Sequence, residues 1–277
     1  MTFFERLKQH YSYALVVLRG LVKTDFKLRY QGSFLGVAWS VLKPLMMFCV
    51  MYVVFGKFLR MSDGTPTYPV VLLLGICSWQ FFQEATTIGL RSVVDRGDLL
   101  RKIHFPNAIV VVSATVGSMI SYAINLLVVL VFALFAHVEF TWRVALVPLS
   151  IVQLYVLALG TTLLFATMYV YFRDIAHIWD VLSQLIFYAM PIIYPLSYVI
   201  DRGEPYASLA RLELLNPIAQ TIQDIRHNLI APATQPTVWN QFGGVAPKIV
   251  PLALTVIILV LGVTLFRRNS RKFAEVM

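Results

Sequence analysis

Residues 107–135 read NAIVVVSATVGSMISYAINLLVVLVFALF, a stretch that carries no charged side chain and is long enough to cross a bilayer as one helix. Directly before it, residues 91–107 read RSVVDRGDLLRKIHFPN and hold six charged side chains, although only 13% of the chain is charged. Pro106 suits the start of a helix, because its missing N–H costs nothing in the first turn. The pair of stretches therefore predicts a membrane helix that follows a polar connection outside the membrane.

The composition of the whole chain agrees with this interpretation. The 277 residues are 58% hydrophobic, with a mean hydropathy of +0.74, which leaves too few polar residues to cover a soluble domain of this size. The net charge of +9 is spread between apolar runs rather than gathered in one patch, so nucleic acid is not the expected partner. Cys49 and Cys77 both lie in apolar runs without disulfide or zinc spacing. We expect an integral membrane protein.

The apolar runs predict an all-α integral membrane protein with six transmembrane helices, at about residues 33–55, 69–90, 107–135, 144–172, 181–200 and 249–266. Residues 3–30 place apolar side chains at steps of three or four and Lys and Arg opposite, which predicts an amphipathic helix in the headgroup layer. This gives an interfacial helix in 1–32 and a six-span domain in 33–277. Residues 201–248 are expected to be helical on both sides of Asn216-Pro217, either as a loop domain or as outer re-entrant helices.

The distribution of positive charge predicts the topology. Most Lys and Arg residues fall in 1–32, in 91–107 and in the C-terminal tail, and positive loops remain in the cytoplasm. Six spans place both termini on one side. We therefore expect both termini, and the polar stretch 91–107, to be cytoplasmic.

Catalytic motifs are absent from the sequence. It contains no GxxxxGK[ST], HExxH, GxSxG or GxGxxG, and its five histidines lie in different segments. Glu84 is the acid placed within the core of a predicted span, near Gln80 and Gln83. It is interpreted either as a proton-relay acid or as one partner of an ion pair, with Arg91 nearby. We expect no catalytic site and no metal site.

Aromatic and neutral polar side chains mark the first and fifth predicted spans. They can pass the apolar faces of sugar rings along a translocation path, or they can simply pack. Pro191 and Pro195 are expected to interrupt the fifth helix, as a moving element or as a static kink. The candidate residues are Phe48, Tyr52, Phe55, Gln184, Phe187, Tyr188, Tyr194 and Tyr198.

Five segments in order carry a family resemblance. The first is the amphipathic N-terminal helix, and the other four read DFKLRYQGSFLGVAWSVLKPL, RGDLLRKIHFPNAIVVVS, YVYFRDIAHIWDVLSQLIFYAMPIIYPLSYV and LLNPIAQTIQDIRHNLI. Together they resemble the permease subunit of type 2 ABC exporters, in the branch that exports O-antigen, teichoic acid and related lipid-linked glycans. The alternative is a type 2 ABC permease for drugs or small lipids. A membrane enzyme and a non-transporting scaffold that recruits an ATPase are the hypotheses from other classes.

The resemblance implies a homodimer of this subunit with two copies of a separate ATPase, which binds ATP and Mg²⁺, so that this chain needs no cofactor. The substrate would be a lipid-linked glycan, and the location the bacterial cytoplasmic membrane. A short coupling helix would seat Leu99, Leu100 and Ile103 in a groove of the ATPase, with Arg101 and Lys102 at its rim.

The resemblance also assigns residues by position. The coupling segment would comprise Asp95, Arg96, Asp98, Leu99, Leu100, Arg101, Lys102, Ile103, His104 and Phe105. The remaining matches are Arg29 and Tyr30 at the end of the interfacial helix, Arg173 and Asp174 in the second cytoplasmic loop, and Asn216 and Pro217 in the re-entrant turn.

Overall fold

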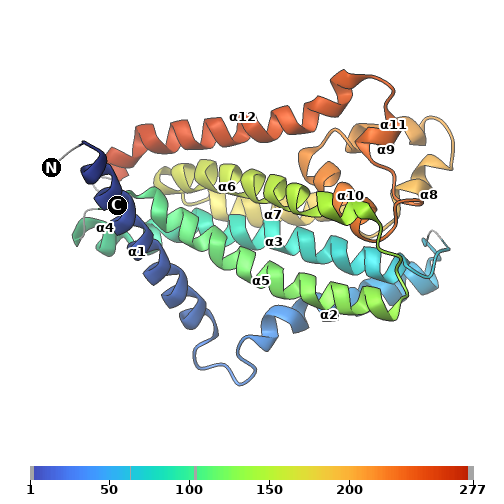
Figure 1. The fold of residues 1–277 in the computed structure, drawn as a ribbon, viewed down its shortest axis with the longest axis horizontal. Helices are drawn as coiled ribbons and strands as arrows, with labels where there is room; N and C mark the ends of the chain where they lie inside the picture. The colour runs from blue at the N-terminus through green and yellow to red at the C-terminus, as the bar shows by residue number, and fades with distance from the viewer. Residues whose placement is uncertain (1–2, 63, 103–104, 274–277) are drawn as a thin grey trace.

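The protein is described by a computed structural model that covers residues 3–62, 64–102 and 105–273, with the backbone only for residues 3–12 and for Tyr30. Within these ranges the regular structure is helical, and the long helices form one elongated bundle (Figure 1). The long helices are α1 (Phe3–Tyr30), α2 (Ala38–Met51), α3 (Tyr68–Asp95), α5 (Ala108–Phe135), α6 (Val147–Tyr171), α7 (Ile175–Ala189) and α12 (Val245–Asn269). The short ones are η1 (Tyr52–Phe58), α4 (Gly97–Lys102), η2 (Trp142–Leu146), α8 (Leu196–Ile200), α9 (Tyr206–Glu213), α10 (Pro217–Leu229), α11 (Val238–Gln241) and η3 (Ser270–Lys272).

α3 is the central helix of the bundle. It packs against α2, α5, α6, α7 and α10, and most of its side chains are buried. Among the described residues, four segments are long and apolar enough to cross a membrane: Ala38–Phe58, Ala108–Phe135, Trp142–Tyr171 and Val245–Lys272. The other two predicted spans correspond to α3, whose Gln80, Gln83 and Glu84 reduce its mean hydropathy, and to the shorter α7 followed by α8.

Small residues allow α6 and α12 to cross closely. A Cβ atom on Gly160 would lie 2.8 Å from the Cα atom of Leu259, and a Cβ atom on Gly262 would clash with the carbonyl oxygen of Gly160. Glycines at such crossings let membrane helices approach through their backbones. The α6–α12 contact therefore depends on these two positions.

The first and fifth predicted spans begin at other residues than expected. α2 begins at Ala38 rather than near Ser33, because Gly32 and Gly36 adopt positive φ angles of 75° and 52° and form a turn. The helix then continues through the π-helical η1 to Phe58.

The fifth predicted span begins earlier than Val181. α7 starts at Ile175, so the break after α6 is confined to residues 172–174. The extra turn is anchored by Trp179, whose ring packs 4.8 Å from that of Phe165 in α6. As predicted, the helix is interrupted at the prolines: α7 ends at Ala189, and α8 begins only at Leu196, directly after Pro195.

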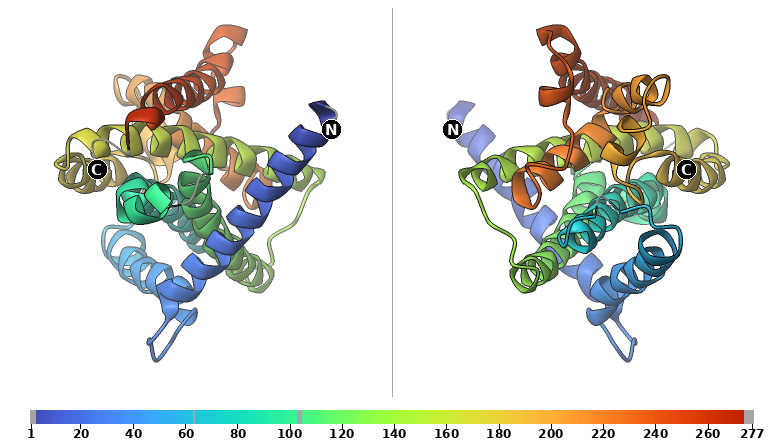
Figure 2. Two further views of the ribbon diagram at one scale, coloured as in Figure 1. Left: turned by 90° about the vertical axis from the view of Figure 1, so that its left-hand side faces the viewer. Right: turned by 90° about the vertical axis from the view of Figure 1, so that its right-hand side faces the viewer.

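The two ends of the bundle differ. The start of α1, α4 and the end of α12 lie at one end, here called the inner end, whereas α8 to α11 lie at the opposite, outer end (Figure 1). α1 crosses the inner end diagonally and packs on α5, while α2 and α7 lie on the same side of the bundle with α3 between them (Figure 2).

Candidate functional site

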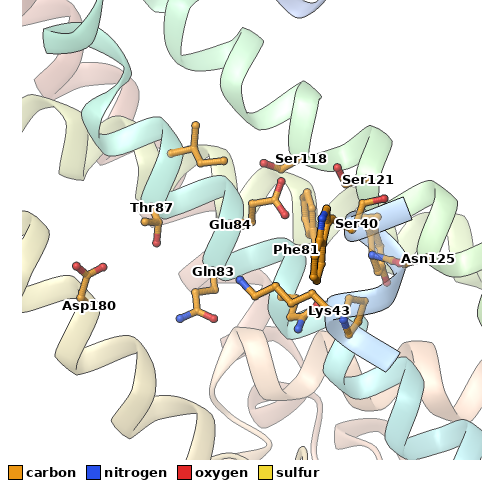
Figure 3. A pocket seen from close by; sticks show the side chains of 15 residues that line it. Ser40, Lys43, Phe81, Gln83, Glu84, Thr87, Ser118, Ser121, Asn125 and Asp180 are labelled. Carbon is orange, nitrogen blue, oxygen red and sulfur yellow. The ribbon is translucent and has the colours of Figure 1, made fainter. Parts of the chain in front are cut away.

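A polar groove with a volume of about 440 Å³ lies among α2, α3, α5 and α7 (Figure 3). Its lining is unusual for helices of this apolarity, because it is rich in hydroxyl, amide and charged side chains. We call it the polar groove, and it is lined by Trp39, Ser40, Lys43, Pro44, Gln80, Phe81, Gln83, Glu84, Thr87, Ile88, Ser118, Ser121, Tyr122, Asn125 and Asp180.

Helical spacing produces this lining. Polar residues that recur every three or four positions share one face of a helix. α3 contributes Gln80, Gln83, Glu84 and Thr87, and α5 contributes Ser118, Ser121 and Asn125. Sequence reasoning missed the members on α5, although a polar side chain at every third or fourth position of an apolar helix was the available signal.

Two ion pairs border the groove. Arg29 of α1 pairs with Glu84 and lies 3.4 Å from the Ser121 hydroxyl, whereas Arg91 pairs with Asp180 at 3.5 Å. Of the two interpretations of Glu84, the structure favours the ion pair, with Arg29 rather than Arg91 as its partner. Both acids therefore have a positive neighbour.

Lys43 extends into the groove toward Gln83 (Figure 3). Its side chain is exposed and has no ion-pair or hydrogen-bond partner among the described residues. Gln83 itself donates a hydrogen bond to Ser183 of α7 at 3.1 Å. Among the described residues, Lys43 thus places an unpaired cation in the groove beside neutral hydrogen-bonding groups, an arrangement that suits a polar ligand with a negatively charged group.

Two of the three aromatic residues predicted in the first span, Phe48 and Tyr52, form a cluster with Tyr68 of α3. The Phe48 and Tyr52 rings stack at 5.7 Å, and the Tyr52 ring lies 6.5 Å from that of Tyr68. Phe48 is buried, whereas Tyr52 and Phe55 are partly exposed. Of the three predicted residues, Tyr52 and Phe55 therefore remain accessible.

The residues predicted in the fifth span do not gather in one place. Phe187 is buried against Trp79 at 6.1 Å, whereas Gln184 and Tyr188 are exposed. Tyr194 donates a hydrogen bond to the Ala189 carbonyl oxygen at 2.9 Å and lies 3.3 Å from Glu213, and Tyr198 accepts one from Arg202 at 2.7 Å. Gln184 and Tyr188 share the face of α7 that the bundle leaves open, while the two later tyrosines brace the outer segment.

Arg226 of α10 holds the interrupted segment in place, and sequence reasoning missed it. Its guanidinium donates to the carbonyl oxygens of Pro191 at 2.6 Å, of Ile192 at 2.7 Å and of Val71 at 3.0 Å. The side chain is 1% exposed, and any side chain at Gly75 would clash with it. The guanidinium thus satisfies the Pro191 and Ile192 carbonyl groups, which lie in the break between α7 and α8, and ties this break to α3 through Val71.

The predicted coupling segment contains the short helix α4 at the inner end. Asp95, Asp98, Arg101 and Lys102 are exposed there, and Leu99 and Phe105 are partly buried. Leu100 packs on an internal cluster that includes Val93, Val111 and Phe273, so it faces this chain rather than solvent. Ile103 and His104 lie outside the described residues.

Arg96, directly before α4, joins this segment to α1. It pairs with Asp25 of α1 and donates to the Ser113 hydroxyl of α5 at 3.1 Å. Together with the Arg29–Glu84 pair, this contact gives α1 one ionic connection to α3 and one to the junction between α3 and α4. The predicted residue Arg29 is thus engaged inside the chain, and the side chain of Tyr30 lies outside the described part.

The remaining predicted positions have local roles. The Asn216 side chain accepts the backbone N–H of Ile218 at 3.0 Å and Pro217 is the first residue of α10, a combination typical of a helix start. Arg173 lies over the Tyr169 ring at 5.0 Å, and Asp174 directly precedes α7. Across the described residues, no group of three or more His, Cys, Asp and Glu side chains is placed to hold a metal ion.

Comparison with known proteins decides the family. The family model described as "ABC-2 type transporter" matches residues 17–230. The chain belongs to the ABC-2 type transporter family. This ABC-2 type transporter is 28% identical over 269 residues to an O-antigen export system permease protein RfbA of Myxococcus xanthus, an alignment that covers 97% of this chain and 98% of the relative. It is 26% identical over 278 residues to an RfbA of Klebsiella pneumoniae, with 98% and 99% covered. The resemblance predicted from five segments is confirmed.

Proposed function

We propose that the chain is the membrane-spanning subunit of an ATP-driven exporter that moves a lipid-linked polysaccharide across the bacterial cytoplasmic membrane. The observation that carries this proposal is the similarity along nearly the whole chain to two O-antigen export permeases. The polar groove supports it, because hydroxyl and amide groups beside aromatic rings make weak, exchangeable contacts with sugars. A moving polymer needs such contacts rather than one tight site.

The proposed topology has six spans. They comprise α2 with η1, α3, α5, η2 with α6, α7 continued by α8, and α12, preceded by the interfacial helix in residues 1–32. Both termini and α4 face the cytoplasm, since the inner end carries the basic segments. α9 and α10 form the outer re-entrant region around Asn216 and Pro217.

The path is proposed to form between two copies of the chain. The groove opens beside α2 and α7, whose outward faces carry exposed apolar side chains that include Met46 and Val50 on α2 and Val181 and Leu185 on α7. A second copy against these faces covers apolar surface and closes the groove into a channel. Tyr52, Phe55, Gln184 and Tyr188 then line the channel, while Phe48 and Phe187 support them from behind.

The inner end is proposed to contact a separate ATPase, which binds ATP and Mg²⁺ and whose conformational change moves α4. The exposed charges of α4 form the contact: Asp98, Arg101 and Lys102. Movement of α4 then reaches α1 through the Arg96–Asp25 pair. It reaches the polar groove through Arg29 and Glu84, because Glu84 lines that groove. The two ion pairs thus join the ATPase contact to the path.

The proposal is tested by deleting the gene and labelling surface polysaccharide on intact cells. We expect surface polymer to disappear, lipid-linked polymer to accumulate inside, and the wild-type gene to restore export. Unchanged surface polymer with altered drug sensitivity would instead support the alternative, a permease for drugs or small lipids.

A further inference from the structure

A second pocket, here called the outer pocket, lies between η2 and the outer helices α10 and α11. It has a volume of about 260 Å³ and shares no lining residue with the polar groove. Two tryptophans border it, Trp142 and Trp239, together with Arg143, Asp224 and His227. Both indoles are at least half exposed. Exposed tryptophans at the end of membrane helices are typical of the level of lipid headgroups.

The outer pocket contains a positive charge, that of Arg143, which forms no ion pair with a carboxylate in the described part of the chain. Arg143 Nη1 lies 2.5 Å from His227 Nε2, and His227 Nδ1 lies 2.8 Å from the carbonyl oxygen of Gln235. Since Nδ1 donates to that carbonyl, Nε2 accepts from Arg143 and the imidazole is neutral. Burial also lowers the pKa of His227, which favours the same neutral form of the imidazole. Arg143 pairs with no carboxylate among the described residues, so its full charge is available to an anion.

The same pocket contains a carboxylate with a free oxygen. Asp224 is 5% exposed, and its Oδ2 accepts from Gln220 at 2.5 Å and from the Trp239 indole N–H at 3.0 Å. Its Oδ1 is buried and has no hydrogen-bond partner in the described part of the chain. Burial raises the pKa of Asp224 to about 6, so a bound cation would stabilise its charged form. The pocket therefore offers sites for a negative and a positive group.

An apolar track leads from the outer pocket along α6. Leu146 lines the pocket, and Leu149 and Val152 follow at steps of three as exposed residues on one side of the helix. Val152 in turn lines an apolar groove of about 480 Å³ between α5 and α6, together with Met119 and Ile120. At 1.5 Å per residue, Val152 lies roughly 9 Å from Leu146 along the helix axis. Exposed apolar side chains thus occupy the surface of α6 between the polar outer pocket and an apolar groove.

We propose that the outer pocket and the α5–α6 groove form one binding site for a glycerophospholipid with an ethanolamine headgroup. Arg143 binds the phosphate, Asp224 receives the ammonium group, and Trp142 and Trp239 flank the headgroup. The acyl chain lies along Leu149 and Val152. A free phosphate or a sugar would leave the apolar groove empty, and an anionic lipid would leave Asp224 unpaired. The site does not depend on which cargo the exporter carries.

The test uses the full chain with its ATPase subunit, purified in detergent, stripped of lipid and titrated with phosphatidylethanolamine or phosphatidylglycerol under native mass spectrometry. We expect the wild type to prefer the ethanolamine lipid. Arg143→Ala should weaken binding of both lipids about tenfold, and Asp224→Asn should keep binding but abolish the preference. Val152→Trp, which fills the groove, should weaken the binding of both lipids. Arg202→Ala, which replaces an exposed arginine outside the pocket, should change the binding of neither.

Equal lipid binding by Arg143→Ala and Arg202→Ala would overturn the proposal, as would a wild-type preference for phosphatidylglycerol. Displacement of the lipid by millimolar inorganic phosphate would assign the pocket to a free anion instead. A retained mass that matches a polyprenyl phosphate would assign it to a cargo carrier. Unchanged thermal unfolding of each variant shows that the differences arise from binding rather than from misfolding.

Discussion

The two ends of α3 are both held by arginine, but through different chemistry. At the inner end, Arg29 and Arg96 each pair with one carboxylate, on Glu84 and Asp25, and the paired side chains remain 17–36% exposed. At the outer end, Arg226 is 1% exposed and donates to three backbone carbonyl groups from two segments. The inner contacts join α1 to α3 and to the residue directly before α4, whereas the outer contact joins α10 to α3 and to the break after α7.

This difference indicates which end can move. A partly exposed ion pair can reorient at modest cost while it stays formed, because water solvates both charges as the side chains move. A buried guanidinium cannot leave its carbonyl partners without exposing several unsatisfied groups to an apolar interior. We infer that α3, α10 and the segment after α7 move as one body, and that α1 is the element free to shift.

The largest expected effect concerns the outer contact. Arg226→Met should leave the Pro191 and Ile192 carbonyl groups without hydrogen-bond donors. We expect this to lower the free energy of unfolding by roughly 1–3 kcal/mol for each group. Gly75→Ala should act similarly, because its Cβ atom would clash with the guanidinium. Thermal unfolding of the purified chain measures this, with Arg202→Ala as the exposed control. Equal melting temperatures for Arg226→Met and Arg202→Ala would contradict the rigid outer end.

A smaller effect, a loss of transport-linked ATP hydrolysis, is expected at the inner end. Reversing Asp98 and Arg101 together, with Asp98→Lys and Arg101→Glu, should lower transport-linked ATP hydrolysis about tenfold, or ~1.4 kcal/mol, because the charged contact with the ATPase is lost. Insertion and dimerisation should persist, since both side chains are exposed. Arg202→Glu provides a charge reversal at the outer end that should leave hydrolysis unchanged. Normal activity of the double variant would show that α4 is not the ATPase contact.

The smallest effect on function is expected for Tyr188 on α7, and its buried neighbour Phe187 provides a control for packing. Tyr188→Ala should reduce polymer export a few-fold without lowering thermal stability, because its side chain is 58% exposed. Phe187→Ala should instead lower stability by about 3–5 kcal/mol, since that ring is buried against Trp79. Surface polymer and melting temperature measure the two. Parallel loss of both quantities in Tyr188→Ala would assign this residue to the core.

The sequence predicted those parts of the fold that depend on local pattern. The charge-free run before Phe135 predicted α5 to within a residue, and Asn216-Pro217 marked the start of α10. The contacts of Arg226 could not be predicted, because its partners lie 34, 35 and 155 positions away and meet only after the helices pack. That Leu100 packs on the internal cluster of this chain could not be predicted for the same reason, because the cluster forms only when the helices pack.

In the proposed coupling, movement of α4 reaches α1 through the Arg96–Asp25 pair. The most direct test of this coupling is substrate-stimulated ATP hydrolysis by the reconstituted exporter carrying Asp25→Arg, Arg96→Asp, or both substitutions. We expect each single variant to lose stimulation, because two like charges then face each other. The double variant should regain most of the stimulation, because it restores the ion pair in reverse. Full stimulation in the single variants, or a double variant as inactive as either single one, would contradict this coupling.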